Sequence, residues 1–183
     1  LTTPTQTTKQ VIVPTRAANE VSRIMGSGVV EIFLGEGQIC FRSPEVELIS
    51  RLIEGQYPDY KQIIPKNYTT EAEMEKERLT QGLKAASLFS SDNNNVELEL
   101  NPQNKQITIK SQSAQVGDSE IGVDAKFAGE KNTIIFNYRY LLECLSNLND
   151  ERVVLKVIGP SSPAAIVPAG RDNYLYIVMP IKV

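Results

Sequence analysis

Residues 135–148 read IFNYRYLLECLSNL, a short apolar run of the kind found in strands that leads directly into a helical pattern. From Tyr138 onward, apolar residues recur at intervals of three, four and seven, which is typical of a helix that buries one face. Similar one-sided patterns occupy residues 16–25 and 71–89, and the later parts of the three patterns recur about 60 residues apart. Residues 12–16, IVPTR, also resemble residues 135–139, IFNYR, so the first and third units begin alike. The spacing predicts a repeated unit in which a strand feeds a helix.

Strand-like segments with period-2 alternation follow each predicted helix, separated by turn residues such as Gly35-Glu36-Gly37 and Asn101-Pro102-Gln103-Asn104. These segments are residues 29–34, 38–42, 46–53, 96–100, 105–111, 121–127, 153–158, 164–167 and 174–180. The pattern predicts an α+β fold built from three helix-plus-antiparallel-strand units. Such units are stabilised by packing side by side.

The residue inventory argues against most enzyme classes. The 183 residues include no His, which excludes the usual general base and the commonest zinc ligand. The two cysteines, Cys40 and Cys144, lie far apart and are expected to be buried free thiols. The longest apolar runs, such as residues 164–167, are too short to span a membrane. We therefore expect no catalytic residues, no metal site and no cofactor.

Carboxylates are the one remaining candidate for chemistry. Glu71, Glu73, Glu75 and Glu77 cluster where the second helix is expected to begin. An acidic first turn is explained by the helix dipole without any reaction. A small enzyme that uses paired carboxylates is kept as an alternative, which would need two of these groups to converge in a pocket with shifted pKa values.

Three stretches resemble one family. The chain ends YIVMPIKV, residues 176–183, which is similar to the last strand of the bacterial DNA polymerase III β subunit, the sliding clamp. Residues 52–60, LIEGQYPDY, continuing through IIPKN at 63–67, resemble the segment between the second and third clamp domains. Residues 136–142, FNYRYLL, resemble the start of the last clamp helix. Together the resemblance covers essentially the whole chain.

The resemblance implies a binding protein. Family clamps have six half-modules per subunit, paired into three domains, and two subunits close head to tail around duplex DNA. Residues 1–62 would be the second half of the middle domain, and residues 63–183 the third domain, so the chain is expected to be a piece of a longer protein. The implied partners are duplex DNA and short peptides of the polymerase III catalytic subunit, the clamp loader and repair polymerases, in a cytoplasmic, nucleoid-associated protein.

The resemblance also assigns residues to three surfaces. The expected peptide-binding residues are Pro58, Gln62, Ile63, Asn137, Tyr140, Pro163, Ala165, Met179, Pro180, Ile181, Lys182 and Val183. The expected DNA-facing residues are Arg16, Arg23, Lys66, Lys84 and Arg139, and the expected subunit contact is Leu88 with Phe89. The chain departs from the family pattern where Gln62 replaces an Arg and where Lys182-Val183 replaces an Arg-Leu ending, so contacts that need a guanidinium are lost.

Two alternatives stay open beside the clamp interpretation. Glu20, Glu77 and Glu143 share the helix faces that carry the basic residues, so an ordinary solvated surface explains those faces equally well. A self-associating β-rich scaffold is the second alternative, since its helices need not line one concave surface.

Overall fold

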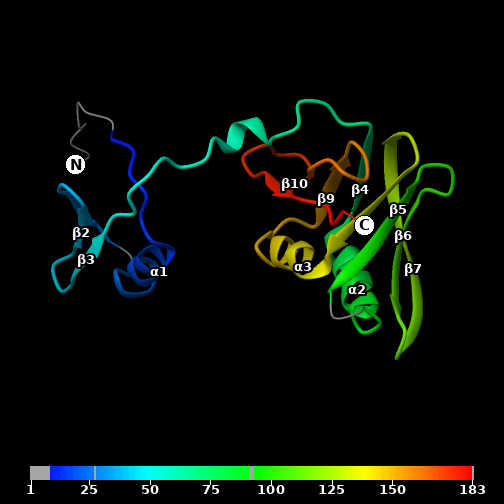
Figure 1. Ribbon diagram of the computed structural model, residues 1–183, viewed down its shortest axis with the longest axis horizontal. Helices are drawn as coiled ribbons and strands as arrows, with labels where there is room; N and C mark the ends of the chain where they lie inside the picture. Colours follow the sequence, from blue (N-terminus) through cyan, green and yellow to red (C-terminus); the bar gives the residue numbers. More distant parts are fainter. Residues whose placement is uncertain (1–8, 27, 91–92, 183) are drawn as a thin grey trace. The chain divides into compact units, whose positions relative to one another are not determined.

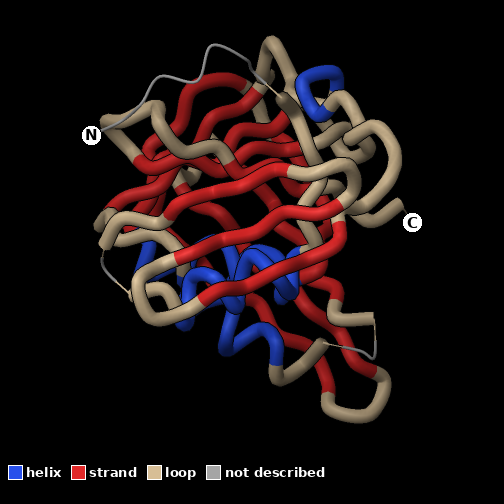
Figure 2. Tube along the Cα trace, turned by 90° about the vertical axis from the view of Figure 1, so that its left-hand side faces the viewer, coloured by secondary structure: helices blue, strands red, loops and turns tan. Residues whose placement is uncertain are grey.

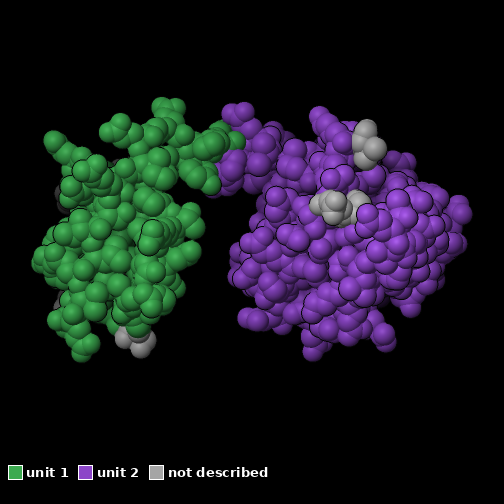
Figure 3. Space-filling model, turned by 60° about the horizontal axis from the view of Figure 1, so that its bottom comes forward, with its two compact units in different colours: residues 1–59 green, residues 60–183 purple. Residues whose placement is uncertain are grey.

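The computed structural model describes residues 9–26, 28–90 and 93–182. The chain forms two compact units, residues 1–59 and residues 60–183, which Figure 3 shows in different colours. Strand makes up far more of the chain than helix (Figure 2). The expected domains, 1–62 and 63–183, remain a prediction about how the chain is organised in a longer protein.

The first unit holds one helix and one small sheet. Helix α1 (Thr15–Ile24) starts directly after Pro14, whose fixed φ suits the position before a helix. Strands β1 (Glu31–Leu34), β2 (Gln38–Arg42) and β3 (Glu47–Arg51) form an antiparallel sheet in sequence order. An isolated bridge between Ile12 and Ile53 ties the segment before α1 to the chain after β3.

The first unit buries few of its apolar side chains. Within its described residues, only Ala17, Met25 and Ile39 are buried hydrophobics. Ile32 and Phe33 are successive residues of β1, so they lie on opposite faces of the sheet, yet both are exposed. Both faces of this sheet therefore present apolar surface to solvent.

The second unit carries the core. Its elements are η1 (Tyr60–Gln62), β4 (Thr70–Glu75), α2 (Lys76–Ser87), β5 (Asn95–Asn101), β6 (Gln106–Ser113), β7 (Gly117–Gly129), β8 (Asn132–Asn137), α3 (Tyr138–Ser146), β9 (Arg152–Val157), β10 (Ala164–Pro168) and β11 (Tyr176–Val178). The strands form one eight-stranded sheet in the order β11-β10-β9-β4-β7-β6-β5-β8. Figure 1 shows α2 and α3 lying together against the sheet.

Alternation along the strands explains which face the helices cover. On β5, Val96, Leu98 and Leu100 are buried, whereas the residues between them are partly exposed. These three side chains join one apolar cluster with Leu79 and Leu83 of α2 and with residues of α3. Apolar residues every second position on a strand and every third or fourth on a helix thus meet in a single core.

The start of the second helix differs from the sequence-based expectation. Residues 70–75 form strand β4, and α2 begins only at Lys76. Thr70, Ala72 and Met74 are fully buried and alternate with glutamates, which is the period of a strand and not of a helix. The prediction of a helix from residue 71 was therefore wrong, and so was the acidic first turn, because only Glu77 lies in it.

The glutamates of β4 form ion pairs across the sheet instead. Glu71 accepts a hydrogen bond from Lys156 Nζ at 3.1 Å, and Glu73 accepts one from Arg152 Nε at 2.6 Å. Both basic residues lie on β9, the neighbouring strand. Opposite charges on adjacent strands favour this register, and each carboxylate of the pair already has a cationic partner.

The other predicted element boundaries differ less from those in the structure. Helix α3 begins at Tyr138 as predicted. Strand β7 extends over Gly117–Gly129, well beyond the predicted 121–127, because its two halves pair with different strands. Strand β11 covers only Tyr176–Val178 of the predicted 174–180. No helix in the described ranges is long and apolar enough to cross a membrane.

Candidate functional site

Three large apolar side chains of the second unit are exposed at positions predicted to bind peptides. Ile63 follows η1 and is 51 % exposed, Tyr140 in the first turn of α3 is 53 % exposed, and Met179 directly after β11 is 55 % exposed. Exposed side chains of this size are favoured anchors in interfaces.

The start of α3 is fixed by its own cap. The Asn137 side-chain oxygen accepts a hydrogen bond from the backbone N–H of Arg139 at 3.0 Å. An Asn at this position satisfies one of the unpaired N–H groups of the first turn. The cap fixes where α3 starts and so places Tyr140 in its first turn, and it uses the Asn137 side-chain oxygen, not the amide NH₂ that a ligand can meet.

The remaining predicted peptide-binding residues differ in accessibility. Pro180, Ile181 and Pro163 are partly buried, and Lys182 is exposed. Ala165 is fully buried on β10 between β9 and β11, so only its surroundings, not its side chain, are available to a ligand. Gln62 is exposed at the end of η1, and Pro58 is exposed in the first unit. Val183 lies outside the described residues.

Tyr174 and Tyr176 lie close to Cys144 and Glu143 of α3. Burial raises the pKa of Tyr176, and the nearby Cys144, Glu143 and Tyr140 raise it further. Burial also raises the pKa of the Cys144 thiol to about 11, while a hydrogen bond with Tyr174 acts in the opposite direction. Tyr174, Tyr176 and Cys144, whose pKa values are all raised, are neutral near pH 7, so these three groups offer apolar and hydrogen-bonding surface. Cys40, which was expected to be buried, is only partly so.

The predicted DNA-facing residues are all exposed. In the first unit these are Arg16 and Arg23, and Arg23 forms an ion pair of 2.6 Å with Glu20. In the second unit they are Lys66, Lys84 and Arg139. Lys84 lines a groove between α2 and α3 together with Glu77 and Glu143. The helix surface of the second unit therefore mixes both signs of charge.

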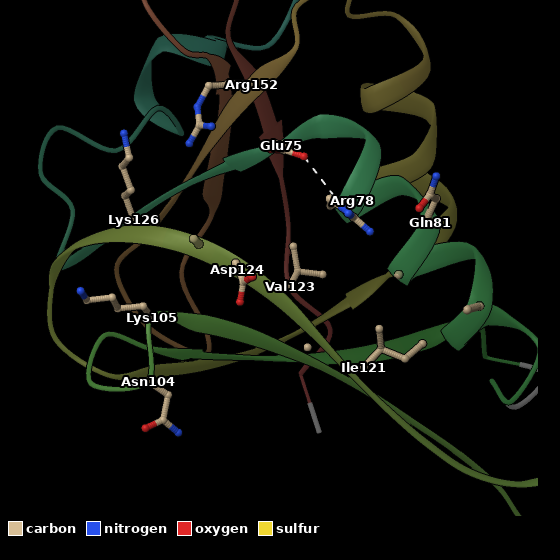
Figure 4. A pocket seen from close by; sticks show the side chains of 14 residues that line it. Glu75, Arg78, Gln81, Asn104, Lys105, Ile121, Val123, Asp124, Lys126 and Arg152 are labelled. Carbon is tan, nitrogen blue, oxygen red and sulfur yellow. Dashed lines mark ion pairs between the residues drawn. The ribbon is translucent and has the colours of Figure 1, made fainter.

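A hollow of about 870 Å³ lies between α2 and β7 (Figure 4). The Ile121 and Val123 side chains of β7 point toward α2, whose Arg78 and Gln81 border the hollow. Residues 117–124 of β7 pair with β6 on one edge. In the described chain, no strand pairs with their other edge. An unpaired strand edge is a template for a further strand.

The predicted subunit contact continues this surface. Leu88 is 73 % exposed at the end of α2, and Phe89 is partly exposed. Arg78, Gln81, Ala85 and Leu88 follow one another at helical spacing and are all exposed. The stripe runs along the same helix that borders the open edge of β7.

Two family models match the chain consecutively. Residues 1–59 match the central domain of the DNA polymerase III beta subunit, and residues 61–182 match its C-terminal domain. The chain belongs to the DNA polymerase III beta subunit family. It spans about half the length of the curated relatives it matches.

Relatives of the beta subunit family agree in sequence and fold. The beta sliding clamp of Synechococcus elongatus is 33 % identical over 177 residues, which are 94 % of this chain and 47 % of that protein. The sliding clamp structure from Bacillus subtilis covers 100 % of this chain and 49 % of its own, with a TM-score of 0.91 and 27 % identity. A beta subunit from Pseudomonas aeruginosa bound to griselimycin has a TM-score of 0.91 and 26 % identity, covering 100 % of this chain and 50 % of its own. The expected clamp fold is confirmed.

The open edge of β7 was missed by sequence reasoning. Ser119, Ile121 and Val123 alternate with exposed residues, which indicates a strand but not which of its edges stays unpaired. Pairing across a sheet depends on contacts distant in sequence, so only the fold reveals it. In the described ranges, no cluster of three or more acidic or cysteine side chains is arranged to hold a metal ion.

Proposed function

We propose that this chain is the C-terminal half of a replication sliding clamp that tethers a polymerase to duplex DNA. The observation that carries the proposal is the clamp fold along the whole chain, at a TM-score of 0.91 to solved clamps. The role is non-catalytic. The ion pairs of Glu71 and Glu73 on a sheet face also argue against a carboxylate enzyme.

The proposed docking site for client peptides centres on Tyr140 and Met179. Both side chains are about half exposed, and Asn137 at the start of α3 supplies a hydrogen-bonding amide. Apolar anchors with a few polar groups fit a short peptide that inserts one or two large side chains. Ile63, Pro180, Ile181 and Lys182 complete the proposed surface within the second unit.

Fluorescence anisotropy tests this docking site. We expect a labelled clamp-binding peptide to bind the chain saturably, and Tyr140→Ala and Met179→Ala each to weaken binding about tenfold or more, since each removes an anchor. Val116→Ala is the matched control, because Val116 is 59 % exposed at the tip of the β6–β7 hairpin and lies outside the proposed site. Equal affinities for all four proteins would contradict the site.

DNA contact by the described basic residues is proposed to be weak and electrostatic. Glu77 and Glu143 stand beside Lys84, which limits attraction to phosphate. We expect filter binding of duplex DNA to fall steeply as salt rises, and Lys84→Ala with Arg139→Ala to weaken it further. Tight binding that is insensitive to salt would contradict this part of the proposal.

The subunit contact of the proposed ring is the open edge of β7 together with Leu88 and Phe89. A strand from the first domain of another subunit would add to residues 117–124, and its neighbouring helix would lie along Arg78, Gln81, Ala85 and Leu88. We expect the N-terminal half of a related clamp to bind the chain in sedimentation velocity. Leu88→Asp should abolish that binding, whereas Leu175→Asp, at an exposed side chain just before β11 and away from β7, should not.

A further inference from the structure

One backbone hydrogen bond connects the end of the chain to the opposite edge of the sheet. The N–H of Ile181 donates to the carbonyl oxygen of Ile135 at 2.8 Å. Ile135 lies on β8, the last strand at one edge, and Ile181 follows β11, the last strand at the other edge. The bond therefore joins the two edges of the eight-stranded sheet through the chain end.

The same bond relates two parts of the proposed docking site. Strand β8 runs from Ile135 directly into Asn137 and the first turn of α3, which carries Tyr140. The chain end carries Met179 and Pro180 between β11 and Ile181. Figure 1 shows the red chain end passing α3, and α3 contacts β11. Tyr140 and Met179 are thus held on segments that meet at Ile135 and Ile181.

Few other backbone hydrogen bonds fix the chain end. Strand β11 pairs with β10 through three residues only, the last being Val178 opposite Ala164. From residue 179 to residue 182, the described chain makes no other backbone hydrogen bond. Pro180 restricts the backbone between the two attachments, because its φ is fixed and it has no N–H to donate. The position of Met179 consequently depends on the attachment at each side of it.

We infer that the hydrogen bond from Ile181 N–H to Ile135 C=O is a clip that places Met179 for peptide docking. The backbone of Ile135 and Ile181 acts as a positioning element, distinct from the side chains that touch the peptide. With the clip closed, Met179 and Tyr140 present one surface. With the clip open, the segment after Val178 samples many conformations. Peptide binding is then weaker, because part of its free energy is used to order that segment. This inference rests on the proposed peptide-docking function.

Methionine-methyl NMR of the full chain tests the clip without any peptide. The chain has three methionines, of which Met74 is fully buried, Met25 is nearly so and Met179 is exposed. Ile181→Pro removes the N–H donor, whereas Ile181→Ala shortens the same side chain and keeps the donor. We expect the Met179 methyl resonance to narrow and move toward its unfolded position in Ile181→Pro, and to stay near its original position in Ile181→Ala.

The Met74 resonance is the internal control for folding, because it reports the core of the second unit. An unchanged Met179 resonance in Ile181→Pro, with Met74 also unchanged, would overturn the inference. A shift of Met179 as large in Ile181→Ala as in Ile181→Pro would also overturn it, since the side chain and not the donor would then position the segment.

A double-mutant cycle on peptide affinity distinguishes positioning from direct contact. We expect Ile181→Pro to weaken binding about three- to tenfold more than Ile181→Ala does. Met179→Ala should weaken binding strongly in the original chain and hardly at all beside Ile181→Pro, because an unplaced Met179 no longer contributes. Full additivity of the two substitutions would contradict the clip. If the original chain binds no peptide, the docking function fails, and the NMR result still decides whether the clip exists.

Discussion

At the scale of single residues, Gly129 is the most tightly constrained glycine of the second unit. It lies at the end of β7 with φ of +102°, a conformation that favours glycine. A Cβ placed there would stand 1.9 Å from the carbonyl oxygen of Thr69, which is backbone and cannot move aside. The close approach is where β7 meets the start of β4.

We predict that Gly129→Ala destabilises the second unit by roughly 3 kcal/mol or more, since it adds both backbone strain and a backbone clash. Urea unfolding followed by circular dichroism measures the loss. Gly159→Ala is the control in the same unit, because nothing lies within 4 Å of its Cβ position. A difference of less than about 1 kcal/mol between the two variants would contradict the reason given.

The two cysteines should react at very different rates. Burial raises the pKa of Cys144 to about 11 and also shields the thiol from reagents, whereas Cys40 is only partly buried. The thiolate is the reactive form. We predict that iodoacetamide at pH 8 alkylates Cys40 in the folded chain and Cys144 only after unfolding. Peptide mapping by mass spectrometry measures the labelling of each cysteine. Equal labelling, or labelling of Cys144 before Cys40, would refute the prediction.

At the scale of elements, an ion-pair cluster joins the strands on the outer face of the sheet. Glu99 of β5 pairs with Lys110 of β6 at 2.7 Å and also with Lys131 in the β7–β8 turn. Hydrogen bonds from these two lysines lower the pKa of Glu99 to about 2. The carboxylate is therefore charged in the folded chain under conditions that protonate it in the unfolded chain.

The cluster gives stability a defined pH dependence. The folded-state pKa of Glu99 lies below its ordinary value of 4.5, so the contribution is complete above about pH 4.5 and is lost as the pH falls toward 2. We predict that Glu99→Gln costs about 1 kcal/mol or less at pH 6, in line with the small energies of surface ion pairs, and less still at pH 3. Urea titrations at the two pH values measure this. A larger loss of stability from Glu99→Gln at pH 3 than at pH 6 would contradict the prediction.

Some elements could be predicted from the sequence, and others could not. Tyr138–Ser146 was predictable as a helix because its apolar spacing and the Asn137 cap act locally. Residues 71–75 were assigned to the start of the second helix, where an acidic first turn suits the helix dipole, although their alternate burial requires a strand. Their ion-pair partners Arg152 and Lys156 lie about 80 residues away, at sequence separations of 79 and 85. Local sequence preferences carry no information about a pairing between such distant residues.

At the scale of the whole molecule, the two units differ in how much apolar surface they bury. The described first unit has three buried hydrophobics, whereas the second has a continuous core across α2, α3 and the sheet. Opening free energies follow buried contacts. We predict that amides of β5 and β6 exchange with deuterium far more slowly than those of β1 and β2 at the same pH. Equal protection in both units would contradict this prediction.

The candidate sites show the same division between local and distant information. Tyr140 was identified from the motif at residues 136–142 and Met179 from the motif at residues 176–183, and their exposure fits a docking role. The burial of Ala165 by β9 and β11, the open edge of β7 and the bond between Ile181 and Ile135 all depend on strand order. None of these can be inferred from a motif, because each joins segments that are brought together only by the folded sheet.

The measurement that tests the central claim most directly is a titration of the methyl-labelled chain with an unlabelled clamp-binding peptide. The proposed docking surface predicts a saturable shift of the Met179 methyl resonance, while the Met74 resonance, fully buried in the core, stays in place. Tyr140→Ala should weaken that saturation. Peptide binding that leaves the Met179 resonance unchanged would contradict the account, because the docking surface would then lie elsewhere on the chain.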